Sequence, residues 1–421
     1  MATLTNPQRP LIDLLTELEA AVRAGDRARA MQLEQTILQR LATEAADQAA
    51  VERRVRALMA ELKLAEPDQP NTRPRVRGAE SFNVVRGAEA SADEGVVYPV
   101  WFATNRKPTA AGDGFTGERN NRVTRGRVEV HVPESHRFGE TGTPFWKRLL
   151  RFDLRDDRLR LQHVTQQERD AFFSDILEAM QSAREGGEQP HALFFLHGFN
   201  VSFEDAAIRA AQIGCDLKVP GATAFFSWPS RGSVTAYPVD EASIEASERA
   251  ITDFLVDFTA NCRAEKVHVI AHSMGNRGLL RALQRIAANA QIAGKVKFGQ
   301  IFLAAPDIDR GLFLDLASLY SEHAVRTTLY ASNRDLPVHF SSKLHDAPRA
   351  GYYEPYTVAP GVDTVAVPDF DIDLLGHSYF AQAEALLHDI HDLMRHNEDP
   401  KQRQRITPAV HEGTAFWRLR R

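Results

Sequence analysis

The chain is poor in cysteine, has no long apolar run and carries no secretion signal. Its 421 residues include only two cysteines, Cys215 and Cys262, and neither lies in a CxxC pair or a Cys/His cluster. No disulfide framework or zinc site is therefore expected, and both thiols are predicted to be small buried side chains. No apolar run is long enough to cross a bilayer, and the first residues lack a charged-then-apolar segment, so a cytosolic location is predicted.

The chain also has no excess of basic residues, and this limits the ligands that it is expected to bind. The formal net charge is −5, and no long basic block occurs, so neither nucleic acid nor an anionic membrane is indicated as a ligand. Association with a membrane surface stays open, because it needs no spanning helix. With 25% charged and 43% hydrophobic residues, the composition is that of a globular protein with one large domain and an appendage.

Composition changes divide the chain into three parts. Residues 1–65 are rich in good helix formers with apolar positions at helical spacing, which predicts a helical hairpin or coiled-coil-like module. Such a module either mediates self-association or partner docking, or packs on the main domain. Residues 66–95 hold several Pro, Arg and Gly with few apolar residues, so a flexible linker is expected. Residues 96–421 form the predicted main domain.

The main domain alternates short apolar runs with helix-forming stretches. Residues 97–103 and 159–164 are strand-like, and residues 126–132 alternate with period two, as in a half-exposed edge strand. Later runs are almost continuously apolar, which is typical of strands covered on both faces of a parallel sheet: 191–196, 222–227, 267–270, 296–304, 327–331 and 362–367. The alternation predicts an α/β fold with a mostly parallel sheet between helices.

A strand, a sharp turn and a helix follow one another around Ser273. The β-branched run 267–270 leads through Ala271 and His272 to the serine, and a helix-forming run begins just beyond Gly275. Small neighbours let the backbone turn tightly and lift the hydroxyl clear of the sheet, as in a nucleophile elbow. Ala271 stands where the G-x-S-x-G pattern has its first glycine. Any strand-to-helix turn can carry serine and glycine. Whether this serine is a nucleophile therefore depends on finding oxyanion donors, an acid and a histidine elsewhere in the sequence.

Residues 194–200 end an earlier apolar strand in a His-Gly pair. Gly198 would let the backbone approach a substrate closely. The expected donors to a developing oxyanion are the backbone N–H of Phe199 or Asn200 and that of Met274, which directly follows the serine; we assign Phe199 and Met274. Each such donor contributes ~3–4 kcal/mol in comparable sites. The alternative is an ordinary strand end, since His-Gly is a common pair.

A triad acid and a histidine should follow the serine in that order. Asp307 ends the first strand-like run after Ser273, and Asp335 ends the second. His377 follows the last run, 362–367, and opens the C-terminal helix, so it is the predicted base. The competing His345 lacks a preceding strand. His268, within the strand before the serine, is expected to be packing.

These segments together resemble a bacterial family of uncharacterised α/β-hydrolases described as predicted esterases or lipases. The matching segments span about 96–391: residues 100–106, 126–130, 195–200, 226–232, 271–276, 303–309 and 377–380. The resemblance implies an α/β-hydrolase fold and serine-hydrolase chemistry carried by Ser273, Asp335 and His377, with no metal or organic cofactor. The usual position of the acid in this superfamily favours Asp335, with Asp307 in reserve as either acid or helix cap.

Other side chains near these motifs have a pocket-lining or a packing interpretation. His197, Asn200, His272 and Trp228 are candidates for lining the substrate pocket, although Trp228 is preferred as a packed side chain beside a Pro-Gly turn. Four acidic residues on the following helix are expected to form a solvated face: Asp240, Glu241, Glu245 and Glu248.

Three functions fit these features. The first is a carboxylester hydrolase that acts on a small or lipid acyl ester through an acyl-enzyme on Ser273. The second is a lipid or phospholipid hydrolase at a membrane surface, which the lack of a basic amphipathic helix makes less favoured. The third is a non-catalytic scaffold that assembles through the N-terminal helices, either with itself or with a protein partner.

Overall fold

The structure is a computed structural model, and two compact units divide the chain at residues 92 and 93. It describes residues 95–133, 159–231, 237–333, 338, 341–342, 345–367 and 380–420. In the first unit it describes only Leu14, Glu17, Arg29 and Leu33, each of them helical. The helical module predicted over 1–65 and most of the linker predicted over 66–95 lie outside the described residues and stay predictions.

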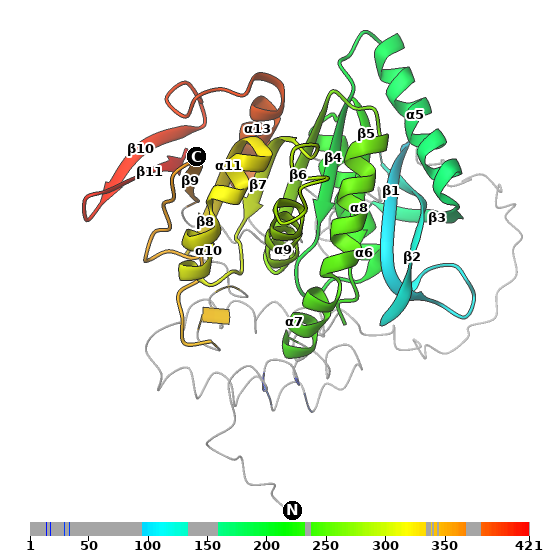
Figure 1. The fold of residues 1–421 in the computed structure, drawn as a ribbon, viewed down its shortest axis with the longest axis horizontal. Coiled ribbons are helices and arrows are strands. Elements are labelled where there is room, and N and C mark those ends of the chain that lie inside the picture. The colour runs from blue at the N-terminus through cyan, green and yellow to red at the C-terminus, as the bar shows by residue number, and fades with distance from the viewer. Residues whose placement is uncertain are drawn as a thin grey trace, which may run out of the picture. The chain divides into compact units, whose positions relative to one another are not determined.

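The described strands of the second unit form one eleven-stranded sheet in the order β10-β11-β9-β8-β7-β6-β4-β5-β1-β2-β3 (Figure 1). These strands are β1 (Val96–Pro108), β2 (Phe115–Val132), β3 (Arg160–Gln167), β4 (His191–Leu196), β5 (Gly221–Ser227), β6 (Lys266–His272), β7 (Phe298–Ala304), β8 (Ala324–Ser332), β9 (Val362–Val367), β10 (Ile406–His411) and β11 (Thr414–Leu419). Every pairing from β1 through β5, β4, β6, β7 and β8 to β9 is parallel. The predicted parallel α/β sheet is therefore confirmed.

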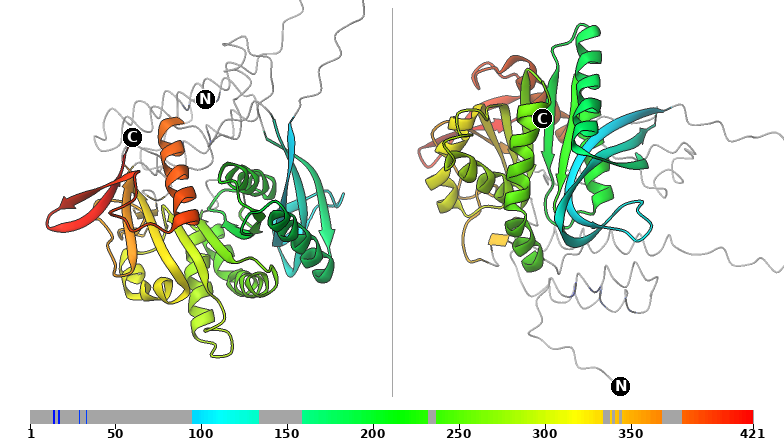
Figure 2. Two further views of the ribbon diagram at one scale, coloured as in Figure 1. Left: turned by 90° about the horizontal axis from the view of Figure 1, so that it is seen from above. Right: turned by 45° about the vertical axis from the view of Figure 1, so that its right-hand side comes forward.

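Helices cover both faces of this sheet (Figure 2). They are α5 (Arg169–Glu185), α6 (Phe203–Asp216), α7 (Tyr237–Ala246), α8 (Glu248–Asn261), α9 (Gly275–Ala287), α10 (Arg310–Leu316), α11 (Ser318–His323) and α13 (Phe380–His396). Two separate apolar clusters form as a result. One joins the sheet to α5, α8, α9 and α11, and the other joins it to α6 and α13. Strands buried on both faces need continuous apolar runs, which explains the sequence pattern.

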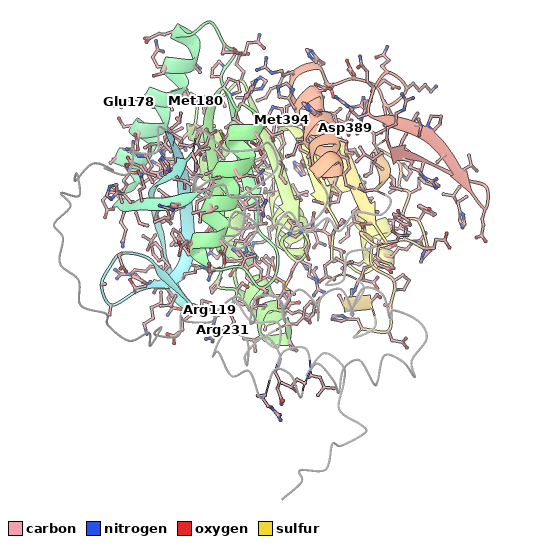
Figure 3. All side chains as sticks on the ribbon, turned by 180° about the vertical axis from the view of Figure 1, so that it is seen from behind. Arg119, Glu178, Met180, Arg231, Asp389 and Met394 are labelled. Atoms are coloured by element: carbon pink, nitrogen blue, oxygen red, sulfur yellow. The ribbon has the colours of Figure 1, made fainter. Side chains whose placement is uncertain are left out.

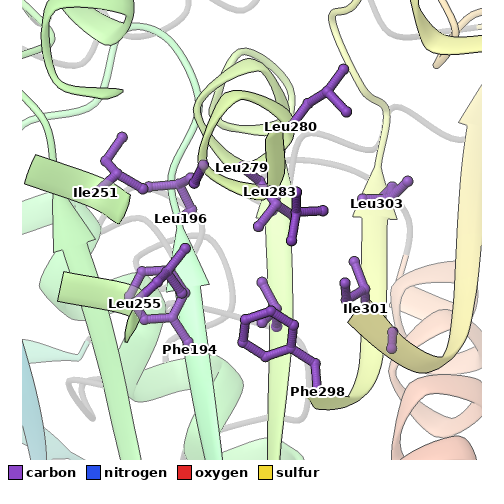
Figure 4. Packing of buried hydrophobic residues seen from close by; sticks show 14 of the residues in the cluster. Phe194, Leu196, Ile251, Leu255, Leu279, Leu280, Leu283, Phe298, Ile301 and Leu303 are labelled. Atoms are coloured by element: carbon purple, nitrogen blue, oxygen red, sulfur yellow. The ribbon is translucent and has the colours of Figure 1, made fainter. Parts of the chain in front are cut away.

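The packing of α9 fixes the segment that follows Ser273. Leu279 and Leu283 lie on the face of α9 that meets the sheet, together with Phe194 of β4 and Phe298 of β7 (Figure 4). All of these side chains are buried. Full burial of each such side chain contributes about 1.5–3 kcal/mol, so the helix is held firmly at the end of β6.

The order of the strands reverses between β4 and β6. The chain runs from β4 outward to β5, then returns to place β6 on the other side of β4 and continues outward through β7, β8 and β9. Ligand sites of open α/β sheets lie at such a reversal, outside the carboxyl ends of the strands. The loops after β4 and β6 therefore flank the expected crevice.

One expectation about the sheet edges was wrong, and one edge element was missed. Residues 126–132 alternate in burial as predicted, yet they belong to β2, which is an interior strand because β3 pairs with its outer side. The C-terminal hairpin of β10 and β11, which extends the sheet beyond β9, was not predicted at all. Its signal is the two-residue turn Glu412-Gly413, in which both residues have positive φ (47° and 79°), as a tight hairpin turn requires.

His268 is buried in β6, as the sequence analysis expected. Its Nδ1 accepts a hydrogen bond from the Gln300 N–H at 3.1 Å, and its Nε2 lies 3.3 Å from Nδ1 of His191, which fits a neutral imidazole whose Nε2–H donates to His191. Burial, and secondarily the neighbouring His191, lowers the pKa of His268 from 6.5 to about 3. Burial also lowers the pKa of His191.

These two histidines predict acid sensitivity. The unfolded chain takes up protons below its ordinary histidine pKa of about 6.5, whereas the folded chain resists protonation of His268 until about pH 3. Stability from this group is thus present above pH 6.5 and is lost as the pH falls. Urea unfolding should give a free energy about 2 kcal/mol lower at pH 5 than at pH 7 from His268 alone. His268→Asn keeps an acceptor near Nδ1 and should show a smaller decrease; an equal decrease in the variant would contradict the assignment.

Candidate active site

Ser273 lies at the turn between β6 and α9 with a positive φ of 47°. A non-glycine residue in this region costs about 1–3 kcal/mol and persists only where its surroundings hold it. Its N–H donates to the Ala304 carbonyl at 2.9 Å, and its carbonyl accepts from the Asp307 N–H at 3.2 Å. The buried Asn276 side chain donates to the carbonyls of Ala271 and Ser273, each at 3.0 Å. Hydrogen bonds with the buried Asn276 side chain and with Ala304 of β7 therefore hold the turn in place.

Close packing explains the small residues around this serine. A Cβ on Gly275 would come within 2.5 Å of the His197 carbonyl oxygen, and one on Gly198 would come within 2.8 Å of His272 Nδ1 and 3.0 Å of Ser273 Cβ. The loop after β4 therefore presses directly against the serine turn. Ala271, which stands at the position of the usual first glycine, is fully buried in β6.

Two backbone N–H groups near the serine have no hydrogen-bond acceptor within the described part of the chain. They belong to Phe199, in the loop after β4, and to Met274, directly after Ser273. The neighbouring Asn200 N–H is directed elsewhere, toward Asp240 Oδ2 at 3.4 Å. Unsatisfied N–H groups at such a turn are the donors that a developing oxyanion needs. The geometry thus favours Phe199 over Asn200 between the two expected donors.

A methyl group at Gly198 should displace this loop. Because the added Cβ would meet His272 Nδ1 at 2.8 Å, Gly198→Ala must move the Phe199 N–H relative to Ser273. We expect kcat for ester hydrolysis to fall ~10²–10³-fold, the loss that follows removal of one oxyanion donor. Gly294→Ala is the control, since a Cβ there meets nothing within 4 Å. Unchanged kcat in Gly198→Ala would argue against a catalytic role for the loop.

His197 and Trp228, two candidates for the pocket lining, are fully buried beneath the loop. Their rings stack with centroids 5.0 Å apart and an interplanar angle of 14°. Trp228 Nε1 donates to the His197 carbonyl at 2.9 Å, while His197 Nδ1 lies 2.8 Å from the Gly198 carbonyl. Burial, and then the nearby Arg106, hold the pKa of His197 well below its ordinary value. Both side chains therefore pack against the loop after β4 and help to hold it in place. This agrees with the prediction that Trp228 is a packed side chain.

Arg106, at the end of β1, ties together three segments around the site. Its guanidinium is buried and donates to Ser227 Oγ at 2.8 Å, to the Ser230 carbonyl at 2.9 Å and to the Val201 carbonyl at 2.7 Å. Burial lowers its pKa, and the carboxylate of Asp240 opposes that effect. Sequence reasoning did not single out this arginine, although it ends the segment 100–106 that carries the family resemblance.

Asp240 corrects the expectation of a fully solvated acidic face on α7. Its side chain is buried, accepting from Ser230 Oγ at 2.5 Å and from the Arg231 N–H at 2.8 Å. Burial raises its pKa, and these hydrogen bonds oppose the rise. The 228–231 loop that it anchors also lies against β2, where a Cβ on Gly117 would approach Arg231 Cα to 3.2 Å (Figure 3).

Asp307, the reserve acid, is buried and surrounded by donors. Its carboxylate accepts hydrogen bonds from Tyr237 Oη and from Ser341 Oγ at 2.5 Å. The guanidinium of Arg277 donates to it at 3.4 Å, and Nε of Arg349 forms an ion pair with it at 3.5 Å. Burial and this carboxylate raise the pKa of Tyr237 well above its ordinary range. The described partners of Asp307 include no histidine.

His345, the competing base, has its described hydrogen-bond partners in Glu241 and Ser341. Its Nε2 lies 3.0 Å from Glu241 Oε1, and its Nδ1 lies 2.9 Å from the Ser341 carbonyl. Glu241 also pairs with Arg277, so this acidic residue of α7 is only partly solvated. Burial raises the pKa of Glu241, but Arg277 outweighs it together with His345, and the net result is a lowered pKa.

The remaining predicted residues divide into two groups. Asn200, with a positive φ of 59°, and His272, 7% exposed, lie beside Gly198 and Ser273 at the same edge of the sheet. Asp335 and His377 lie outside the described residues, so their roles stay predictions. No helix among the described residues is both long and apolar enough to span a membrane.

The strand order and the serine turn define an α/β hydrolase. Residues 176–395 match the family described as "Alpha/beta hydrolase of unknown function (DUF900)", and this match covers more than half of the chain. The chain therefore belongs to that family, which confirms the resemblance found in the sequence. No curated protein matches the chain.

Solved structures similar to this chain share little sequence with it. An uncharacterized protein from Bacillus cereus ATCC 10987 is 13% identical with a TM-score of 0.33, covering 50% of this chain and 61% of its own length. Phospholipase PlaB from Legionella pneumophila, in complex with thio-NAD, is 10% identical with a TM-score of 0.29, covering 54% and 67%. An esterase from Rhizomucor miehei is 11% identical with a TM-score of 0.31, covering 72% and 85%. The chain thus spans about three fifths of the Bacillus protein.

Proposed function

We propose that this protein is a serine hydrolase that cleaves a carboxylic ester through an acyl-enzyme on Ser273. The observation that carries the proposal is the conformation of this serine. It has a positive φ at the switch point of the sheet and lies beside two N–H groups, of Phe199 and Met274, that have no acceptor among the described residues. A strained serine of this kind at the end of a parallel strand is the mark of a nucleophile elbow.

The proposed reaction proceeds in two acyl-transfer steps. His377 removes the proton from Ser273 Oγ, which attacks the ester carbonyl, and Asp335 holds the imidazole in the productive tautomer. The N–H groups of Phe199 and Met274 stabilise the tetrahedral oxyanion. The alcohol leaves with the proton from His377. Water then attacks the acyl-enzyme by the same route and releases the carboxylic acid, which restores the serine.

The network around Asp307 supports Asp335 as the acid. Three donors, from Tyr237, Ser341 and Arg277, already occupy the Asp307 carboxylate, and Arg349 lies beside it. A carboxylate so engaged has little capacity left to accept from an imidazole Nδ1–H. We therefore assign Asp307 the role of holding the segments after β7 and around Ser341 to α7 and α9.

A fluorophosphonate probe tests the proposal directly, because it reacts covalently with an activated serine. The wild type should gain one adduct, and mass spectrometry of peptides should place it on Ser273. Ser273→Ala should not label. Absence of labelling in the wild type, or equal labelling of the variant, would refute the mechanism. A panel of p-nitrophenyl esters of rising chain length then defines the acyl group that the site accepts.

A further inference from the structure

A cavity of about 190 Å³ lies between α7, α9 and the start of α10, and Ser273 is not among the described residues that line it. Its volume corresponds to about six water molecules at their liquid density. Its lining includes three apolar side chains, Leu280 on α9, Ile308 after β7 and Leu312 on α10. It also includes three arginines, Arg277 and Arg281 of α9 and Arg349. The cavity can therefore accommodate a small molecule that has both a polar and an apolar end.

Arg349 is the unusual member of this lining. It is 4% exposed, and its guanidinium makes no hydrogen bond within the described part of the chain; Nε and Nη2 are fully buried, so Nη1 is the nitrogen that a ligand can reach. Its single charged contact is the 3.5 Å ion pair of Nε with Asp307, a carboxylate that already accepts from Tyr237, Ser341 and Arg277. The Nη1 of such a guanidinium is stabilised by an acceptor from outside the protein chain, either water or a ligand.

The chemistry of the lining selects the class of acceptor. A carboxylate oxygen accepts a short, charge-assisted hydrogen bond from a guanidinium N–H. Two acidic residues, Glu245 and Asp309, also line the cavity, and they disfavour a doubly charged phosphate more than a singly charged carboxylate. The apolar side chains of the lining favour an alkyl chain on the same molecule.

We propose that this cavity binds a short-chain monocarboxylate, with its carboxylate on Arg349 and its alkyl chain against Leu280, Ile308 and Leu312. The site differs from the proposed catalytic one and does not depend on the reaction proposed for Ser273. It adjoins that region through Arg277, whose Nε donates to the Asp307 carbonyl at 2.6 Å, while the Asp307 N–H donates to the Ser273 carbonyl.

Isothermal titration calorimetry with acetate, butyrate and hexanoate tests the proposal on the full chain. Saturable binding should strengthen about fourfold per methylene group that becomes buried, the equivalent of the transfer free energy of one methylene. Butan-1-ol, which has the chain of butyrate but no charge, should bind at least tenfold more weakly. Absence of carboxylate binding, or inorganic phosphate binding more tightly than hexanoate, would overturn the assignment.

Four variants locate the binding. Arg349→Gln should weaken hexanoate binding at least tenfold, while Arg395→Gln, which changes an exposed arginine on α13 on the other face of the sheet, should not. Leu312→Trp fills the cavity from an exposed position, so it should abolish binding even if Arg349→Gln folds poorly. Ser273→Ala should bind as the wild type does. Binding lost in Ser273→Ala but kept in Leu312→Trp would place the carboxylate at the serine and overturn the proposal.

Discussion

Ser273→Ala should lower kcat for a p-nitrophenyl ester ~10⁴–10⁶-fold, since removal of a triad nucleophile leaves only the contribution of binding and the oxyanion donors. The reason is local: the φ of 47° and the bonds from Asn276 hold this hydroxyl at the sheet edge, and the alanine side chain has no oxygen to attack with. The fold should be retained, because the variant removes one oxygen atom and leaves the backbone bonds of the turn in place.

Stopped-flow and steady-state hydrolysis of p-nitrophenyl butyrate provide the measurement. Ser321→Ala is the matched control, since Ser321 lies on α11 and its hydroxyl donates only to the Ser318 carbonyl at 2.9 Å. Its kcat should equal that of the wild type. An initial burst of p-nitrophenol in the wild type would report the acyl-enzyme. Retention of most activity by Ser273→Ala would show that a different group performs the chemistry.

Exchange of each candidate acid for asparagine should separate catalysis from stability. Asp335→Asn should lower kcat about 10⁴-fold, because the amide presents the wrong hydrogen-bonding pattern to His377, with a free energy of unfolding within about 0.5 kcal/mol of the wild type. Asp307→Asn should do the reverse. It leaves the buried Arg349 without its ion pair and Arg277 with Glu241 alone, so we expect a loss of about 3–5 kcal/mol in stability while folded molecules keep most of their kcat.

Urea unfolding and kinetics on the same preparations measure both effects. Asp315→Asn on α10, an exposed position, controls for the change of charge and should alter neither quantity. Each variant is expected to change one measured quantity only: kcat in Asp335→Asn, and the free energy of unfolding in Asp307→Asn. A ~10⁴-fold loss of kcat in Asp307→Asn, with full activity in Asp335→Asn, would transfer the role of triad acid to Asp307 despite its network of donors.

Much of the fold was predictable because its signals are local. Continuous apolar runs identified the central strands from β4 to β9, since burial on both faces favours apolar residues at most positions. The serine turn was predictable for the same reason. A small residue after Ser273 is required, because a Cβ on Gly275 would come within 2.7 Å of the Leu196 carbonyl oxygen at the end of β4.

Charged residues were harder to assign, because their environment comes from distant parts of the chain. The helical position of Asp240 on α7 suggested solvent, yet Ser230 and Arg231 from the preceding loop and Asn200 from the loop after β4 bury it. Arg106 likewise faces carbonyls that lie about a hundred residues away. Sequence periodicity describes one element at a time and contains no information on such partners.

The amino-acid sequence by itself determined that the main domain is an α/β hydrolase and that Ser273 occupies a tight turn after a buried strand. Tertiary structure alone decided which N–H groups next to that serine lack an acceptor among the described residues, that donors surround Asp307, and that a cavity adjoins the Arg349 guanidinium, which makes no hydrogen bond within the described part of the chain. The physical reason is the range of the forces involved. Backbone propensity and apolar periodicity act over a few residues, whereas hydrogen bonding and burial of charge depend on groups that only the folded chain brings together.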